Sequence, residues 1–349
     1  MAGGPAGHRG SRETADSTAL ATEKERISLM SILVTGSLAI DHIMVFEDLF
    51  KKHVLPEQIH RLNVAFLVPS LEKRWGGTGG NIAFNLRLLG EDPLLLGTVG
   101  SDFDAYADWL DHHGIRRDYL RVLEDNFTAQ AFITTDLDSN QLIVFHPGAM
   151  ARAHEARLAD ISEEISLGIV SPNGKEAMID YTEEMKSRGI PCVVDPGQQL
   201  PTFEGEELLD LLTGAGILVV NDYEWLLCQE KTGLDEDAIA ERVGALVVTR
   251  GAEGSLVRRG GQAVGFEIES ERSEIPCVKA EKVVDPTGCG DAYRSGLLHA
   301  LVRGLSLETG ARLGSLMGAL KVAEAGPQSI SLDRDAIASR FEAEFGTQF

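Results

Sequence analysis

The sequence is poor in cysteine, in long apolar runs and in positive charge, and each shortage excludes a class of protein. Its four cysteines form no C-x-x-C pair, which excludes a disulfide scaffold and favours a reducing cytoplasm. No run reaches the roughly eighteen apolar residues of a membrane helix, so we expect no membrane partner. Lys and Arg number 32 against 54 Asp and Glu, a net charge of −22. Because no dense basic run is present to follow a phosphate backbone, we expect no nucleic acid partner either.

Residues 1–30 differ from the rest of the chain. They combine Gly, Ser and Thr with charges of both signs, and they lack the apolar core of a signal peptide. We predict a disordered N-terminal extension over 1–30. The remainder, 31–349, is long enough for one large domain with an accessory piece.

Short apolar runs alternate with helical patterns along the chain. The first covers 31–37, and the second half has four more, at 169–171, 192–196, 217–221 and 246–249. Such alternation predicts an α/β fold, a doubly wound and mostly parallel sheet flanked by helices. The runs end in polar residues that we expect at one edge of the sheet, where such folds bind ligands: Ser171, Asp195, Asn221 and Thr249.

A glycine-spaced turn with the sequence DPTGCGD leads into a helical pattern after Asp291. This places Gly288, Cys289 and Gly290 at a helix N-terminus, where unpaired N–H groups and the helix dipole favour an anion. Asp291 would then be placed to take a proton from a hydroxyl group that attacks a phosphoryl group. The alternative is a capped helix after a glycine turn, with no chemistry.

A second glycine-rich segment, Gly76-Gly77-Thr78-Gly79-Gly80-Asn81, opens another helical pattern. Four glycines permit unusual backbone angles and the close approach of a ligand. The spacing is not G-x-G-x-x-G, because Ile82 takes the last position, and no Walker A segment occurs; both observations exclude common nucleotide fingerprints. Asn81 either contacts a substrate or serves as an ordinary N-cap.

The DPTGCGDA segment resembles the C-terminal signature of the ribokinase-like (PfkB) carbohydrate and nucleoside kinases, with Cys289 where that family most often has alanine. Four further segments resemble family motifs in the family's order. The resemblance implies a ribokinase-like fold, with Asp291 as catalytic base and the Gly288, Cys289 and Gly290 amides as anion hole. It implies that Glu224 helps to hold Mg²⁺ through water. The other residues that it implies are substrate-binding Asp41, Gly77 and Asn81, and ATP-binding Asn221, Thr249, Gly251 and Gly254.

The stretch between the first strand and the second glycine segment lacks the alternation of strands and helices. Spacing at Val64, Phe66 and Val68 predicts a strand there, and 128–135 with 141–145 predicts a hairpin. The resemblance implies that two segments, about 43–75 and 116–146, form a small β-sheet lid over the substrate. Apolar lid residues suit a flat purine, or they pack on one another or on a second subunit. Monomer and homodimer therefore both stay open.

We predict a cytoplasmic phosphotransferase that moves the γ-phosphoryl group of ATP to the 5′-hydroxyl of a nucleoside, with Mg²⁺ and a monovalent cation such as K⁺ as implied cofactors. The phrases FHPGAM, DPGQQLP and NDYE look most like bacterial adenosine kinases of this family, which favours conversion of adenosine to AMP in purine salvage. Thr78-Gly79-Gly80 is nearer to the ribokinase form, so a sugar kinase for ribose or fructose is the alternative. A nucleoside-binding regulator without turnover is a third hypothesis, against which the intact Asp291 and Glu224 argue.

Overall fold

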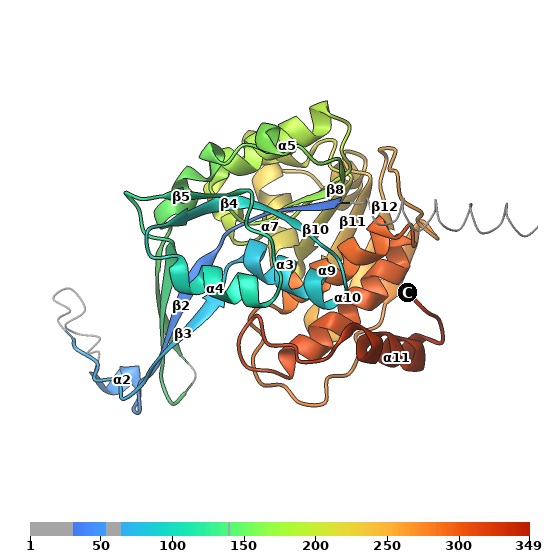
Figure 1. Cartoon of the computed structure of the whole chain (residues 1–349). Coiled ribbons are helices and arrows are strands. Elements are labelled where there is room, and N and C mark those ends of the chain that lie inside the picture. The colour runs from blue at the N-terminus through green and yellow to red at the C-terminus, as the bar shows by residue number, and fades with distance from the viewer. Residues whose placement is uncertain (1–30, 54–63, 139) are drawn as a thin grey trace, which may run out of the picture.

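The computed structural model describes residues 31–53, 64–138 and 140–349, and the predicted extension 1–30 lies outside them. A nine-stranded sheet in the order β13-β12-β11-β10-β9-β8-β1-β4-β5 forms the body of the described structure (Figure 1). Its strands are parallel except β12, which is antiparallel to both neighbours. The predicted mostly parallel α/β sheet is confirmed. The strands are β1 Ser31–Thr35, β4 Leu94–Gly100, β5 Leu120–Leu123, β8 Ile165–Val170, β9 Cys192–Val194, β10 Ile217–Asn221, β11 Ala245–Thr249, β12 Ser255–Arg259 and β13 Arg272–Ile275.

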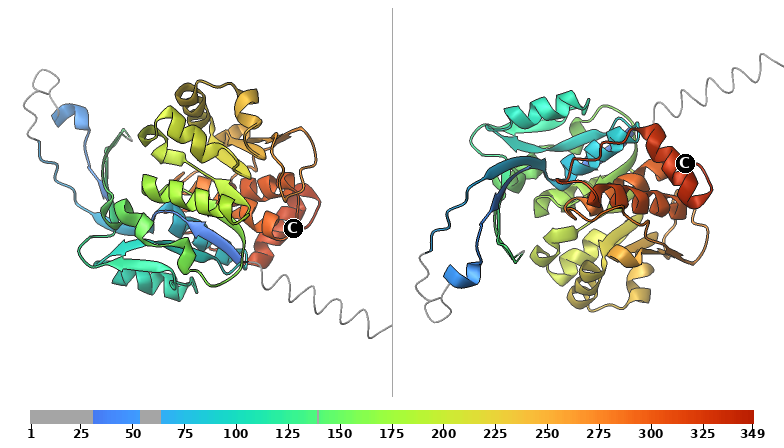
Figure 2. Two further views of the ribbon diagram at one scale, coloured as in Figure 1. Left: turned by 90° about the horizontal axis from the view of Figure 1, so that it is seen from above. Right: turned by 90° about the horizontal axis from the view of Figure 1, so that it is seen from below.

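Helices cover both faces of this sheet, as Figure 2 shows from above and from below. Alternate strand residues enter two separate cores: Val219 faces the core shared with α3, α4, α9 and α10, and Leu218 faces the core shared with α5, α6, α7 and α8. Strands buried on both faces need continuous apolar sequence, which explains the runs seen in the chain. The helices are α2 Phe50–His53, α3 Thr78–Leu88, α4 Asp104–His112, α5 Lys175–Ser187, α6 Gly205–Leu212, α7 Asp222–Thr232, α8 Glu236–Ala240, α9 Cys289–Val302, α10 Leu307–Val322 and α11 Arg334–Phe345, with 3-10 turns η2 Gly148–Glu155, η3 Leu158–Asp160, η4 Gly197–Thr202 and η5 Gly251–Glu253.

A separate four-stranded sheet extends from one side of the body, in the order β3-β2-β6-β7 (Figure 1). Its strands are β2 Ala39–Val45, β3 Leu71–Gly76, β6 Ala129–Thr135 and β7 Gln141–His146. The predicted hairpin is confirmed, because β6 and β7 pair antiparallel. Leu120–Leu123, inside the second segment assigned to the lid, instead forms β5 and pairs with β4 in the large sheet.

The strand predicted at Val64, Phe66 and Val68 is wrong, since these residues form no strand. Their side chains are half-buried in alternation with exposed neighbours, which reproduces the pattern of a strand without a partner strand. Phe66 packs edge-on against Phe46 and Phe50, with ring centroids 4.8 and 5.0 Å away. Phe66 is therefore partly buried by an aromatic cluster and not by pairing in a sheet.

Asp102 ties the small sheet to the large one. It follows β4, and its carboxylate accepts hydrogen bonds from the Thr128 N–H and the Gln130 amide, each at 2.7 Å. The chain therefore enters β6 from a fixed point on the large sheet. In the described part of the chain, no helix has the length and apolar character needed to cross a bilayer.

Two glycines let α9 and α10 approach closely. A Cβ added to Gly296 would lie 2.6 Å from the backbone nitrogen of Gly314, and one added to Gly314 would lie 2.7 Å from the Tyr293 carbonyl oxygen. Since real Cβ atoms do not come this near, the helices would have to separate. This contact holds α9, and with it the glycine turn at its N-terminus, against α10.

We expect Gly296→Ala to lower the free energy of unfolding by about 1–3 kcal/mol, because an overpacked interior must shift its backbone. Urea denaturation followed by circular dichroism measures the change. Gly265→Ala is the matched control, since a Cβ at Gly265 meets nothing within 4 Å. Equal unfolding midpoints for the two variants would contradict close packing at Gly296.

Candidate active site

Polar residues line the carboxyl edge of the large sheet. β8, β9, β10 and β11 are neighbours and parallel, so Ser171, Asp195, Asn221 and Thr249 lie along one edge as predicted. The Ser171 hydroxyl has two acceptors for its one proton, the Thr35 carbonyl oxygen at 2.7 Å and the Thr78 hydroxyl at 3.0 Å. The contact with Thr78 joins the sheet edge to the start of α3, and the contact with Thr35 joins it to the end of β1. The candidate site lies where this edge meets α3.

The glycine turn predicted to bind an anion stands at the start of α9. Gly288 is the N-cap with φ 80°, and the helix begins at Cys289. A Cβ at Gly288 would lie 2.8 Å from Cβ of Pro327, so both the backbone angle and the neighbour require glycine. The Cys289 N–H donates to the Pro286 carbonyl at 3.1 Å. Among the described residues, the Gly288 and Gly290 amides donate to no main-chain carbonyl outside the helix, which leaves them available to an anion.

Asp291 lies in the first turn of α9 with only 9% of its surface exposed. Its Oδ2 accepts a hydrogen bond of 2.8 Å from the Asn81 side-chain amide. Burial raises the pKa of Asp291 to about 6, the Asn81 hydrogen bond and the positive charge of Arg294 lower it, and the Glu224 carboxylate raises it. A carboxylate with this pKa is a stronger base than an exposed one and is still largely ionised at neutral pH.

Asn81 is not a helix cap, so the alternative stated from the sequence is wrong. Helix α3 begins three residues earlier, at Thr78, with Gly77 as N-cap at φ 85°. A Cβ at Gly77 would lie 2.4 Å from the Ser37 carbonyl oxygen, so the backbone turns there against the end of β1. The turn places Asn81 on the buried side of α3, where it faces Asp291 of α9.

A chain of hydrogen bonds links Asn81 to the base of the small sheet. Gln328 donates to the Asn81 side-chain oxygen at 3.1 Å and to the Tyr106 hydroxyl at 2.7 Å, and Tyr106 donates to the Gly76 carbonyl at 2.9 Å. The sequence analysis missed Gln328 and Tyr106. The available signal was the position of Gln328 directly after the Gly-Pro break, since a polar residue in such a turn often points inward.

The sequence analysis also missed a buried ion pair between Asp195 and Arg294. The Arg294 guanidinium donates to Asp195 Oδ1 from Nη2 at 2.8 Å, and its Nε contacts Oδ2. Burial raises the pKa of Asp195, and the charge of Arg294 opposes that rise. Arg294 follows Asp291 by three residues, so both face the sheet edge from one side of α9, a spacing that could have identified it.

Asp41 lies on β2 of the small sheet, opposite Arg74 of β3. A Cβ at Gly76 would lie 2.5 Å from Asp41 Oδ2, so the carboxylate rests on the glycine segment before α3. Burial raises the pKa of Asp41 to about 6, and the Asp285 carboxylate raises it as well. The negative charges of Asp41 and Asp291 both raise the pKa of Tyr106, which burial raises most. Asn81 bonds Asp291 directly, and it is joined through Gln328 and Tyr106 to Gly76, which lies beside the Asp41 carboxylate and precedes Gly77.

Asn221 and Glu224 form a capping box at the start of α7. The Asn221 side-chain oxygen accepts from the Glu224 N–H, and Glu224 Oε2 accepts from the Asn221 N–H, each at 2.8 Å. Glu224 therefore uses one carboxylate oxygen to cap the helix, and its other oxygen remains for other partners. In the described ranges, no group of three or more His, Cys, Asp and Glu side chains is arranged to hold a metal ion.

The segment after β11 has the open backbone expected of a nucleotide turn. Gly251 and Gly254 have φ of 54° and 87°. A Cβ at Gly254 would lie 2.1 Å from the Ile275 carbonyl oxygen, whereas one at Gly251 meets nothing within 4 Å. Arg250 contacts Glu274 rather than standing free. Gly254 is needed for packing, and Gly251 leaves open space beside Thr249.

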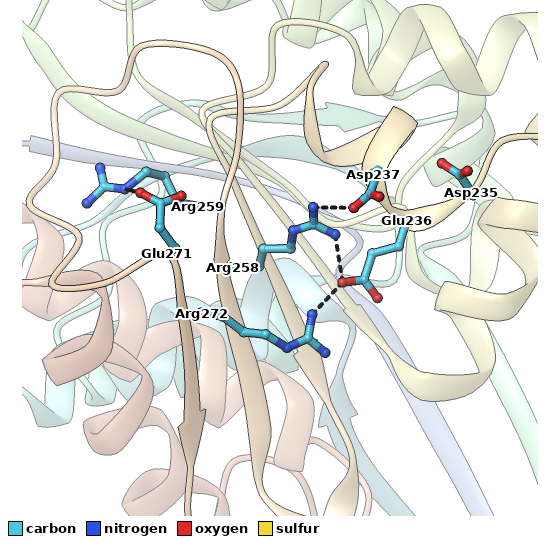
Figure 3. Close-up of a pocket in the computed structure, with 7 residues that line it drawn as sticks. All are labelled: Asp235, Glu236, Asp237, Arg258, Arg259, Glu271 and Arg272. Atoms are coloured by element: carbon cyan, nitrogen blue, oxygen red, sulfur yellow. Dashed lines mark hydrogen bonds and ion pairs between the residues drawn. The ribbon is translucent and has the colours of Figure 1, made fainter.

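A separate surface pocket near α8 holds three arginines (Figure 3). Arg258 pairs with Glu236 and Asp237 at 2.7 and 2.5 Å, and Arg272 pairs with Glu236 at 2.6 Å. Both arginines lie at the amino edge of the sheet, because β12 runs antiparallel to β11. This ion-pair network is therefore on the edge opposite to the candidate site.

Comparison with known proteins is consistent with this geometry. The profile of the pfkB family carbohydrate kinases matches residues 31–334. A nucleoside kinase from Methanocaldococcus jannaschii is 32% identical over 316 residues, which cover 89% of this chain and 96% of that protein.

Solved structures give the same result. The nucleoside kinase of Burkholderia thailandensis in complex with inosine is 44% identical, with a TM-score of 0.80, and the match covers 91% of this chain and 99% of that one. The adenosine kinase of Sinorhizobium meliloti is 21% identical with a TM-score of 0.70, over 89% of this chain and 99% of that one; it shares the fold.

Proposed function

The chain belongs to the pfkB family of carbohydrate kinases, and within that family we propose that it transfers the γ-phosphoryl group of ATP to the 5′-hydroxyl of a nucleoside, with adenosine as substrate. The observation that carries the proposal is the buried Asp291 carboxylate, held by Asn81 at 2.8 Å directly beside the glycine turn. The Burkholderia relative was also solved with ADP-inosine, which supports ATP and a purine nucleoside as the two substrates. A cytoplasmic role in purine salvage follows from this proposal.

Asp291 acts as the general base in the proposed reaction. Its carboxylate accepts the proton of the 5′-hydroxyl as the oxygen attacks the γ-phosphorus, and the bond to the ADP oxygen breaks. Asn81 donates to one carboxylate oxygen and so leaves the other free to accept the proton. The Gly288 and Gly290 amides, at the positive end of α9, stabilise the negative charge that develops on the transferred group, whereas the Cys289 N–H, also expected to contribute, already donates to the Pro286 carbonyl.

The remaining site residues hold the two substrates. Asp41, Gly77 and Asn81 surround the space for the ribose hydroxyls, since a carboxylate accepts two adjacent O–H groups. Asn221, Thr249, Gly251 and Gly254 face the nucleotide at the carboxyl edge.

Glu224 retains one carboxylate oxygen outside its capping box. This hard oxygen fits Mg²⁺ held through water, because Mg²⁺ usually keeps several waters and takes few protein ligands. When bound, Mg²⁺ neutralises charge on the phosphates.

The small sheet forms the lid over the purine ring of the nucleoside. It carries exposed apolar residues such as Phe132 and Val144, which suit a flat ring.

An assay of ADP release tests this function. Adenosine, inosine, ribose and fructose are compared at equal concentrations, and we expect turnover with the purine nucleosides. Turnover with the sugars alone would exclude a nucleoside kinase, and nucleoside binding without any ADP release would favour the regulator.

The rate should depend on the ionisation of Asp291. Because its pKa is raised to about 6, the carboxyl is increasingly protonated below that pH, and kcat/KM is expected to fall there and to level off above about pH 7. Asn81→Ala removes a hydrogen bond that lowers this pKa, so its acidic limb should move to higher pH. The control Asn126→Ala removes a half-buried side chain that donates to Asp125 and should leave the profile unchanged. A profile that is flat between pH 5 and 7 would refute the assignment of Asp291.

A further inference from the structure

A fully buried ammonium group lies beside the glycine turn. Lys321, in the last turn of α10, is 0% exposed. Its Nζ donates to the carbonyl oxygens of Asp285 at 3.0 Å and of Glu324 at 2.9 Å. Taking an ammonium group out of water is costly unless polar partners replace the water, so a lysine held here on main-chain carbonyls calls for a reason.

The ammonium group joins the two loops that build the site. Asp285 precedes the glycine turn, and its carboxylate accepts from the Thr287 N–H at 2.9 Å and from the Gly326 N–H at 2.8 Å. Glu324 leads into the Gly326–Gln328 segment, which contacts Gly288 through Pro327 and Asn81 through Gln328. The charge of Lys321 therefore fixes the turn and the partner of Asn81 at once.

Burial lowers the pKa of Lys321, and this is the largest effect on it. The Asp285 and Glu324 carboxylates oppose that change, whereas the positive charge of Arg74 adds to it. The ammonium group donates to main-chain oxygens. The charged side chains near it are two carboxylates and one guanidinium, so their net charge is negative.

Converging main-chain carbonyls are the usual ligands of K⁺ in proteins. The monovalent cation that the family resemblance implies would require such oxygens. At Asp285 and Glu324 the oxygens converge, but Lys Nζ occupies the space between them, so a free K⁺ does not fit there. An ammonium ion and K⁺ are close in size and carry the same charge, and the lysine can replace the ion.

We propose that Lys321 is a built-in monovalent cation, a positioning residue that holds the glycine turn and makes the enzyme independent of K⁺. The inference rests on the proposed function for its activity readout. If the Lys321 side chain is removed, the space that it leaves should bind a small monovalent cation.

The test compares wild type and Lys321→Ala in buffers containing choline, K⁺, NH₄⁺ or methylammonium. Wild-type ADP release should be equal in choline and K⁺. Lys321→Ala in choline should be slower by about tenfold or more, given that losing one direct oxyanion donor costs roughly 10²–10³, and K⁺, NH₄⁺ or methylammonium should restore most of the rate. Lys321→Met, which fills the space without charge, should be slow in every salt.

Lys186 offers a matched control. Its ammonium group also donates to two carbonyls, of Asp210 at 3.1 Å and Leu211 at 3.2 Å, but it lies at the end of α5, away from the carboxyl edge. Lys186→Ala should show no cation dependence.

The melting temperature of each protein, with and without ADP, is measured in the same salts. This readout keeps the test valid if the wild type shows no nucleoside turnover, which would refute the proposed function alone. Cation-specific stabilisation of Lys321→Ala supports the inference. A wild type that needs K⁺, a Lys321→Ala variant as active and stable in choline as wild type, or one that no cation restores, would overturn it.

Discussion

Asp291→Asn is expected to lower kcat by about 10²- to 10⁴-fold, the usual contribution of a general base. The variant keeps the size of the side chain, and its amide oxygen can still accept from Asn81, which donates to Oδ2 at 2.8 Å in the wild type. Nucleotide binding should therefore change little. Steady-state ADP release gives kcat, and calorimetric titration with ADP gives the affinity.

Asp333→Asn is the control for this exchange. Asp333 is the N-cap of α11, and its side chain accepts from the Ala336 N–H; asparagine caps a helix as well as aspartate does. This variant should keep the wild-type rate. If Asp291→Asn also turned over at the wild-type rate, the base would have to be another group.

Arg294→Leu is expected to lower the free energy of unfolding by about 3–5 kcal/mol, because it leaves the Asp195 carboxylate buried without its partner. In the wild type the guanidinium and this carboxylate are 7% and 3% exposed. Without Arg294, burial and the negative charges of Glu224 and Asp291 act on Asp195 unopposed, so its pKa rises further and the carboxyl takes up a proton on acidification. The loss of stability should therefore be larger at pH 8 than at pH 6, as measured by urea denaturation.

The double variant Asp195→Asn, Arg294→Met separates the charge from the shape of the pair. Removing both charges should restore part of the stability, since a neutral pair leaves no uncompensated charge. A double variant as unstable as Arg294→Leu would show that packing, and not the unpaired carboxylate, sets the loss.

The parallel sheet and the glycine turn could be predicted from the sequence because both follow from local patterns. Apolar runs such as 217–221 specify a strand buried on two faces, and the glycine spacing before Asp291 specifies a helix start. The strand at Val64, Phe66 and Val68 was predicted wrongly because alternating apolar residues can be partly buried without strand pairing, as Phe66 is in its aromatic cluster.

The partners of the candidate base could not be found in the same way. Asn81 was identified, but its contact with Asp291 depends on the packing of α3 against α9. Gln328 lies in a loop whose place is set by how the folded chain packs, and the spacing of Arg294 from Asp291 shows which face of α9 it takes but not that Asp195 is its partner. The burial that raises the pKa of Asp291 is likewise a property of the assembled structure.

The contact between Asn81 and Asp291 joins residues that are 210 positions apart, and the contact between Gln328 and Asn81 joins residues that are 247 apart. During synthesis on the ribosome, the first of these residues must wait for almost the entire remaining chain to emerge. Loops of this length close slowly, so the early strands have to persist without the groups that later complete them. A nascent chain halted before Gln328 would contain the carboxyl edge of the sheet and the proposed base, yet it would lack the amide that bonds Asn81, the partner of that base.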